Sequence, residues 1–156
     1  MAVLWRRVII QEYKLERLKE VVDIESDWEA VDEAINRILF SDEIHRMLND
    51  DGCEILVPHI CDIEVISALR SVVRRRQADT GRAREAIRDY MELPIERLNH
   101  HPFLERIFEM RDNFSAYNAA YVAVVEAFEA PLYTTDERLA RAVVDIFHGA
   151  GGAVVH

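Results

Sequence analysis

From residue 54 onward, short apolar segments alternate with amphipathic helical segments along this chain. Glu54–Pro58 is one of the apolar segments; Gly52 precedes it and a proline ends it, which is typical of a strand buried in a parallel sheet. In the residues that follow, Ile60, Ile63 and later apolar side chains recur every three or four positions, which predicts a helix. The alternation predicts an α/β fold with a mainly parallel sheet of four or five strands.

The other expected elements continue this order. Residues 115–128 are so apolar that their helix must be covered on most sides. The helix over residues 101–112 is expected to turn Phe103, Leu104, Ile107 and Phe108 inward. Further helices are expected over residues 81–91 and 137–147, and further strands over residues 3–10, 93–98, 130–135 and 153–155.

Length and composition indicate one globular domain over residues 1–156, with half of the side chains hydrophobic. No apolar run approaches the roughly 18 residues that cross a bilayer, and the first residues lack the apolar stretch of a signal peptide. Cys53 and Cys61 form no metal-binding pattern and are interpreted as half-buried thiols. We therefore expect a soluble, cytoplasmic protein with no membrane partner.

The charge is unevenly distributed along the chain. The net charge of −10 argues against a protein that coats nucleic acid by electrostatics alone. Residues 70–88 nevertheless carry seven arginines against two acidic side chains. Within this stripe, Arg74, Arg75 and Arg76 are candidates for contact with an RNA backbone or an acidic partner, and the alternative interpretation is a solvated helix face.

Three oxygen-bearing side chains are expected at one edge of the sheet, because ligands of parallel α/β folds bind where the strands end and the helices begin. Glu64 follows the strand at residues 54–58, Asn118 lies in the first turn of the apolar helix, and Asp136 ends the strand at residues 130–135. Such a set suits Mg²⁺ or Mn²⁺ rather than zinc, and it commonly supports phosphodiester hydrolysis. Taken singly, each residue also has a structural interpretation at a helix N-terminus.

Polar neighbours extend this candidate site. Ser115, Thr134 and Thr135 are expected either to hydrogen-bond a metal-bound water or phosphate, or to act as caps and strand residues. The histidines His59, His100 and His101 are interpreted as structural hydrogen bonders rather than ligands.

Three stretches carry a resemblance to a known family. Residues 111–123 read RDNFSAYNAAYVA, residues 130–140 read APLYTTDERLA, and residues 57–70 read VPHICDIEVISALR. In order and spacing they resemble PIN-domain proteins of the VapC toxin type, over about residues 44–147.

This resemblance implies a three-layer α/β/α sandwich and a Mg²⁺-dependent endoribonuclease. It also implies a toxin that a cognate antitoxin holds inactive, that acts on RNA, and that is usually a homodimer. The alternative is a catalytically silent PIN-fold module that binds an antitoxin or RNA.

The family's four acidic positions are matched in part. Glu64 and Asp136 match plainly, whereas Asn118 stands where the family has an aspartate. By spacing, Asp23 is the preferred first acid, but if residues 1–5 form the first strand, Trp5 replaces that acid. Residues 1–43 therefore form an atypical N-terminal region.

Overall fold

The computed structural model describes residues 7–11, 46, 49, 52–134, 136–146 and 154–155. Its strands are β1 (Arg7–Gln11), β2 (Glu54–Pro58), β3 (Ile95–Leu98), β4 (Leu132–Thr134) and β5 (Val154–Val155). Its α-helices are α4 (Ile60–Arg74), α5 (Thr80–Glu92), α6 (Leu104–Glu109), α7 (Ala116–Phe128) and α8 (Glu137–Ile146), and two 3-10 turns, η1 (His101–Phe103) and η2 (Met110–Asp112), flank α6.

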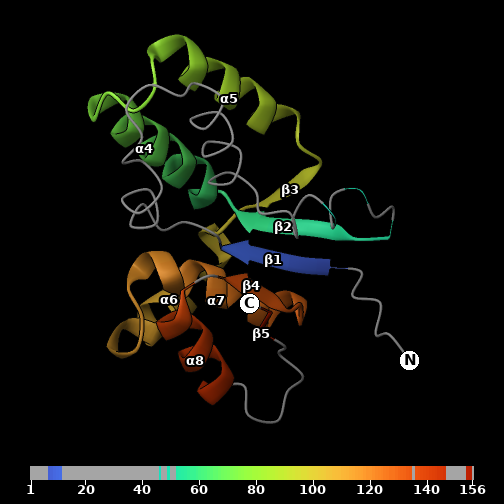
Figure 1. The fold of residues 1–156 in the computed structure, drawn as a ribbon. Helices are drawn as coiled ribbons and strands as arrows, with labels where there is room; N and C mark the ends of the chain where they lie inside the picture. Colours follow the sequence, from blue (N-terminus) through green and yellow to red (C-terminus); the bar gives the residue numbers. More distant parts are fainter. Residues whose placement is uncertain are drawn as a thin grey trace.

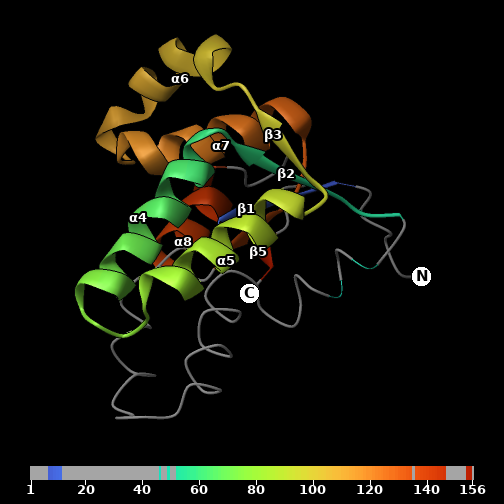
Figure 2. The same cartoon turned by 90° about the horizontal axis from the view of Figure 1, so that it is seen from above.

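These strands form one sheet in the order β3-β2-β1-β4-β5, and every neighbouring pair is parallel. The central strand β1 pairs with β2 through Val8 opposite Ile55, and with β4 through Ile10 opposite Tyr133. Helices α4 and α5 lie together on one side of the sheet, and α6 and α7 lie on the other (Figures 1 and 2). The arrangement is compatible with the PIN-like α/β fold that the sequence predicts.

Helix α7 is the buried helix of the core, as its composition predicts. Seven consecutive side chains, from Ala119 to Val125, are buried, and Tyr121 is the largest of them. All of them except Ala120 pack in one cluster with Leu56 of β2 and Val65 of α4. Because this helix is held on several sides, its first turn has a fixed place relative to the sheet.

The structure corrects the expected helix over residues 101–112. It is divided into η1, α6 and η2, with Pro102 in the opening turn. Phe103 and Ile107 are partly buried, but Leu104 is 50% exposed and Phe108 is 68% exposed, so the last two do not face inward. Among the described residues, no helix has the length and apolar character needed to cross a bilayer.

Candidate active site

The candidate site lies where β2, β1 and β4 end. These strands are parallel neighbours, so their carboxyl ends meet at one edge of the sheet. Neighbouring strands are about 4.8 Å apart, which puts the ends of β2 and β4 roughly 10 Å from each other. From this edge α4 leads away from β2 and α8 leads away from β4, the position at which α/β sheets bind ligands.

Glu64 lies in the N-terminal part of α4 and is half buried. The Tyr121 hydroxyl of α7 donates a hydrogen bond to its Oε2 atom. Burial raises the pKa of Glu64, and the hydrogen bond from Tyr121 partly opposes this rise. Burial also raises the pKa of Tyr121, so its hydroxyl stays protonated and remains a donor at neutral pH. The result is an oriented carboxylate in a site that favours a compensating cation.

Asn118 lies on the same side of α7 as Tyr121. The two residues are three positions apart, a spacing that makes them neighbours on a helix surface. Asn118 thus lies about one turn before the residue that contacts Glu64. The Asn118 backbone N–H donates to Ser115 Oγ at 3.2 Å, so Ser115 acts as the N-cap of α7.

Asp136 joins β4 to α8. Its Oδ1 accepts hydrogen bonds from the backbone N–H groups of Arg138 at 2.9 Å and Leu139 at 3.2 Å, so this carboxylate caps the helix. Its own backbone N–H donates to Thr134 Oγ1 at 3.0 Å, and Thr134 is completely buried. These bonds fix Asp136 at the carboxyl end of β4.

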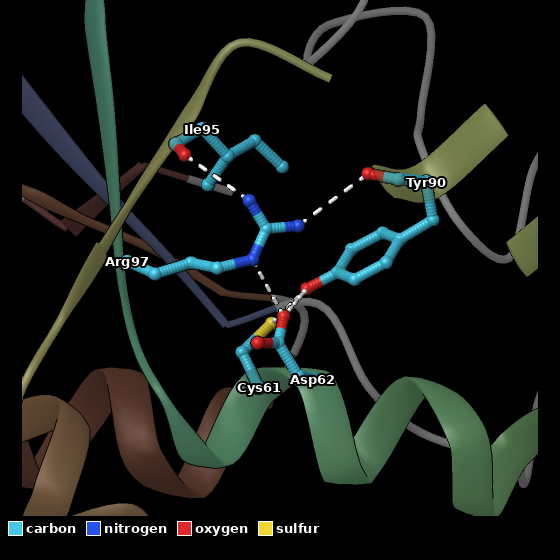
Figure 3. Close-up of polar contacts among 5 residues, drawn as sticks. All are labelled: Cys61, Asp62, Tyr90, Ile95 and Arg97. Carbon is cyan, nitrogen blue, oxygen red and sulfur yellow. Dashed lines mark hydrogen bonds and ion pairs between the residues drawn. The ribbon is translucent and has the colours of Figure 1, made fainter. Parts of the chain in front are cut away.

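A second polar cluster lies two residues before Glu64 (Figure 3). Asp62 Oδ1 accepts a hydrogen bond from the Tyr90 hydroxyl at 2.6 Å and one from Arg97 Nε at 2.8 Å. The Arg97 guanidinium also reaches the carbonyls of Tyr90 and Ile95, and its central carbon lies 5.0 Å from the centroid of the Tyr90 ring. The cluster therefore ties the start of α4 to the end of α5 and to β3.

Beside this cluster lies an open cavity of about 500 Å³. It is lined by residues from the ends of β2 and β3, from α4 and from the first turn of α7, namely His59, Ile60, Asp62, Ile63, Arg97, His100 and Tyr117. The His59 and His100 rings meet edge to face, with centroids 6.3 Å apart. Ile63, which helical periodicity predicts to be buried, is instead 68% exposed at this cavity.

The arginine triplet lies away from these groups. Arg74 ends α4 and is followed by Arg75 and Arg76, and all three side chains are exposed. Ten residues of helix separate Glu64 from Arg74, which corresponds to about 15 Å. Any contact that these arginines make with RNA is therefore distant from Glu64.

Two predicted site residues, Asp23 and Thr135, lie outside the described residues, as does Trp5. The described central strand β1 ends at Gln11. Within the described part of the chain, no three His, Cys, Asp or Glu side chains gather closely enough to hold a metal ion. The predicted ligands that the structure does describe are the carboxylates of Glu64 and Asp136 and the amide of Asn118, and oxygen ligands of this type are those that Mg²⁺ prefers.

Sequence reasoning missed Tyr121, Tyr90 and Arg97. Tyr121 lies in a helix whose apolar periodicity marks it as core, and a tyrosine in such a helix needs a partner for its hydroxyl. This need for a hydrogen-bond partner is the sequence signal that could have pointed to Tyr121. The pairing of Arg97 with Asp62 joins residues 35 positions apart and has no local signal.

No family model matches the chain. It is 40% identical over 83 residues to Ribonuclease VapC9 of Mycobacterium tuberculosis and, to the same extent, to VapC ribonuclease Mb0985 of Mycobacterium bovis; each match covers 53% of this chain and 65% of the relative. It is also 32% identical over 90 residues to Ribonuclease VapC12 of M. tuberculosis, which covers 58% of this chain and 70% of that protein. The matched part of the chain thus spans about two thirds of the length of these relatives.

Proposed function

Because this chain belongs to the VapC ribonuclease family, we propose that it is a metal-dependent endoribonuclease and the toxin of a toxin–antitoxin pair. One structural observation carries the proposal most directly. Glu64 is half buried, oriented by Tyr121, and located where the parallel strands end. An oriented, partly desolvated carboxylate at that edge is suited to binding a cation next to a phosphodiester.

Mg²⁺ or Mn²⁺ is the proposed cofactor. Glu64 and Asp136 would hold the ion through carboxylate oxygens and Asn118 through its amide oxygen, with Asp23 as the predicted fourth ligand. When bound, such an ion neutralises phosphate charge and lowers the pKa of a coordinated water. The residues of the chain contribute orientation: Tyr121 holds the Glu64 carboxylate, and the Thr134 hydroxyl fixes the backbone of Asp136.

Cleavage of single-stranded RNA under single-turnover conditions tests this proposal. We expect cleavage with Mg²⁺ and none with EDTA. In Glu64→Gln the cleavage rate should fall at least about 100-fold, since the substitution removes one negative charge from the cation site. Glu105→Gln, on the exposed face of α6, is the matched control and should cleave normally. Equal rates for the unmodified chain and Glu64→Gln would refute the assignment of this site.

An antitoxin is the proposed inhibitory partner. Two carboxylates near one sheet edge attract a cation, and an arginine offered by a partner segment would form charge-assisted hydrogen bonds with Glu64 and Asp136. Such a segment would block the site that we assign to RNA cleavage. We further propose that the active form is a homodimer in the cytoplasm, and that Arg74, Arg75 and Arg76 contact RNA or the partner away from the cleaved bond.

A catalytically silent binding module is the second candidate function. The observation that favours it is Asn118, because an amide contributes no negative charge to a cation site. In that case the carboxylates of Glu64 and Asp136 would bind a basic segment of a partner, or the site would remain without metal. The effect of Asn118→Asp on cation affinity and RNA cleavage distinguishes the two candidates.

A further inference from the structure

The cavity lined by Ile63, Tyr117 and His100 shares two helices, α4 and α7, with the proposed cleavage site. Ile63 precedes Glu64 in α4, and Tyr117 precedes Asn118 in α7. Two residues of the cavity wall thus directly precede, in the sequence, two residues that we propose as ligands of the cation. A group in the cavity would lie at the same edge of the sheet, and between the same two helices, as a phosphate held at Glu64.

The chemistry of these walls suits a flat, uncharged, hydrogen-bonding ligand. Tyr117 is 59% exposed and offers an aromatic ring, and Ile63 is an apolar side chain of the same cavity. His100 contributes a partly exposed imidazole to the wall. Its Nδ1 atom is buried and has no hydrogen-bond partner in the part of the chain that the structure describes, so a ligand in the cavity would meet the exposed part of the ring. A ligand that stacks on a ring and carries donors and acceptors at its edge meets both requirements.

The cavity is not a phosphate site, although it includes an arginine. Arg97 is already bound to Asp62 at 2.8 Å and reaches two backbone carbonyls, so its charge is compensated within the protein. The remaining wall residues named above are aliphatic, aromatic or imidazole side chains. This lack of excess positive charge favours a nucleobase over a phosphate or a carboxylate.

We propose that this cavity binds one unstacked nucleobase of the RNA, next to the phosphate that is cleaved, and that Tyr117 and His100 determine which base is accepted. The inference rests on the proposed ribonuclease function. Bases splayed out of single-stranded RNA stack on aromatic side chains and are distinguished by hydrogen bonds at their edges. Tyr117 supplies the stacking surface, and His100 supplies a group that reads the edge.

The experiment uses a pool of single-stranded RNA randomised at every position, with cleavage sites mapped by sequencing the new 5′ ends. The unmodified chain should show a base preference at one position beside the cleaved bond. Tyr117→Ala should flatten this preference and lower kcat/KM about tenfold, mainly through KM, because stacking binds the ground state as well as the transition state. Tyr117→Phe should retain both properties, and His100→Ala should change which base is preferred.

Met91→Ala is the matched control for removal of an exposed apolar side chain. Met91 ends α5, is 70% exposed and does not line the cavity. It should leave both the preference and kcat/KM unchanged. If Tyr117→Ala cleaves with the preference and KM of the unmodified chain, the inference is wrong while the proposed ribonuclease function stands.

RNA binding in EDTA, measured by fluorescence anisotropy of a labelled RNA from the same pool, separates the two ideas. If no RNA is cleaved but Tyr117→Ala still weakens binding about tenfold, the base site stands and the proposed catalytic function falls. If Tyr117→Ala leaves RNA binding unchanged and instead weakens binding of the co-encoded antitoxin, the cavity accepts a protein segment and the base site is refuted.

Discussion

The Tyr121 hydroxyl of α7 donates a hydrogen bond to the Glu64 carboxylate of α4, across helices that lie on opposite sides of the sheet (Figures 1 and 2). Tyr121 is completely buried, whereas Glu64 is only half buried. The bond therefore connects the hydrophobic core to the candidate site. It makes the orientation of the candidate carboxylate, Glu64, depend on the packing of the buried helix α7.

Removal of this donor should affect both stability and cleavage. In Tyr121→Phe, Glu64 loses the hydrogen bond that holds its Oε2 atom, and we expect the free energy of unfolding to fall by about 2 kcal/mol. RNA cleavage should fall about tenfold, because a ligand that loses its orienting partner is held less firmly. Denaturant titration and single-turnover cleavage measure the two effects.

Tyr117→Phe is the control for the change in stability, because the hydroxyl that it removes belongs to a side chain that is 59% exposed. Its free energy of unfolding should equal that of the unmodified chain. Full activity and full stability of Tyr121→Phe would contradict an orienting role for Tyr121.

Asn118 is predicted to limit the affinity for the cation. An added carboxylate increases the attraction to a divalent ion, and although desolvation and repulsion from Glu64 offset most of that gain, a net of about 1.4 kcal/mol already corresponds to tenfold in affinity. We expect Asn118→Asp to raise Mg²⁺ affinity and Mg²⁺-dependent RNA cleavage by at least about tenfold. Greater toxicity on expression should accompany this gain.

Asn118→Ser is the matched control, since it keeps a side-chain oxygen without adding charge. It should show no gain in affinity or rate. If Asn118→Asp binds metal and stays folded but cleaves no faster than the unmodified chain, Asn118 does not limit catalysis and the silent-module function becomes the better account.

Asp136 is expected to contribute to antitoxin binding through its charge. Asp136→Lys should weaken the complex with the co-encoded antitoxin, because it replaces the acceptor of the proposed arginine by a like charge. It should also cost about 1 kcal/mol of stability, since Asp136 Oδ1 caps α8 through two backbone N–H groups.

Asp136→Asn separates the two effects, because asparagine is an equally good N-cap. Its thermal stability should match that of the unmodified chain while its antitoxin affinity falls. Unchanged antitoxin affinity in both variants, measured by calorimetry, would rule out an arginine bound at this position.

Alkaline pH should destabilise the fold through buried groups near the start of α4. Burial raises the pKa of the Cys61 thiol from its ordinary value of 9.0 to about 11. The unfolded chain therefore loses this proton first, so the stabilisation is present below pH 9 and is lost as the pH rises toward 11. The shift corresponds to about 3 kcal/mol, and the raised pKa of buried Tyr121 acts in the same direction above pH 10.

Denaturant titrations at pH 8, 9 and 10 measure this dependence. Cys61→Val, which fills a similar volume without a titrating group, should show a shallower decline between pH 9 and 10. An identical decline in the unmodified chain and Cys61→Val would show that Cys61 is not responsible.

The sequence predicts the elements that carry the site better than it predicts the contacts within it. The short apolar run at Glu54–Pro58 and the periodic segment after it correspond to β2 and α4, so Glu64 could be placed near a strand end in advance. Likewise the apolar composition of α7 predicts its burial. These features are local, because they depend on the period and length of neighbouring residues.

Contacts between distant segments could not be predicted from the sequence in the same way. Tyr121 and Glu64 are 57 positions apart, and their hydrogen bond depends on how α7 and α4 cross the edge of the sheet. Leu104 and Phe108 have the apolar character of core residues, but η1 and η2 interrupt the helix and leave Phe103 and Ile107 on the packed side. Apolar character alone does not determine which side of a short, interrupted helix is buried.

Calorimetric titration of Mn²⁺ into the metal-free chain measures whether Glu64 and Asp136 form a cation site. We expect saturable binding with a Kd below about 1 mM, because the site has two carboxylates, and the loss of this binding in Glu64→Gln. Glu96→Gln, an exposed residue of β3, should bind as the unmodified chain does. The absence of saturable heat in the unmodified chain, or the same Kd in Glu64→Gln, would show that these carboxylates do not form a cation site.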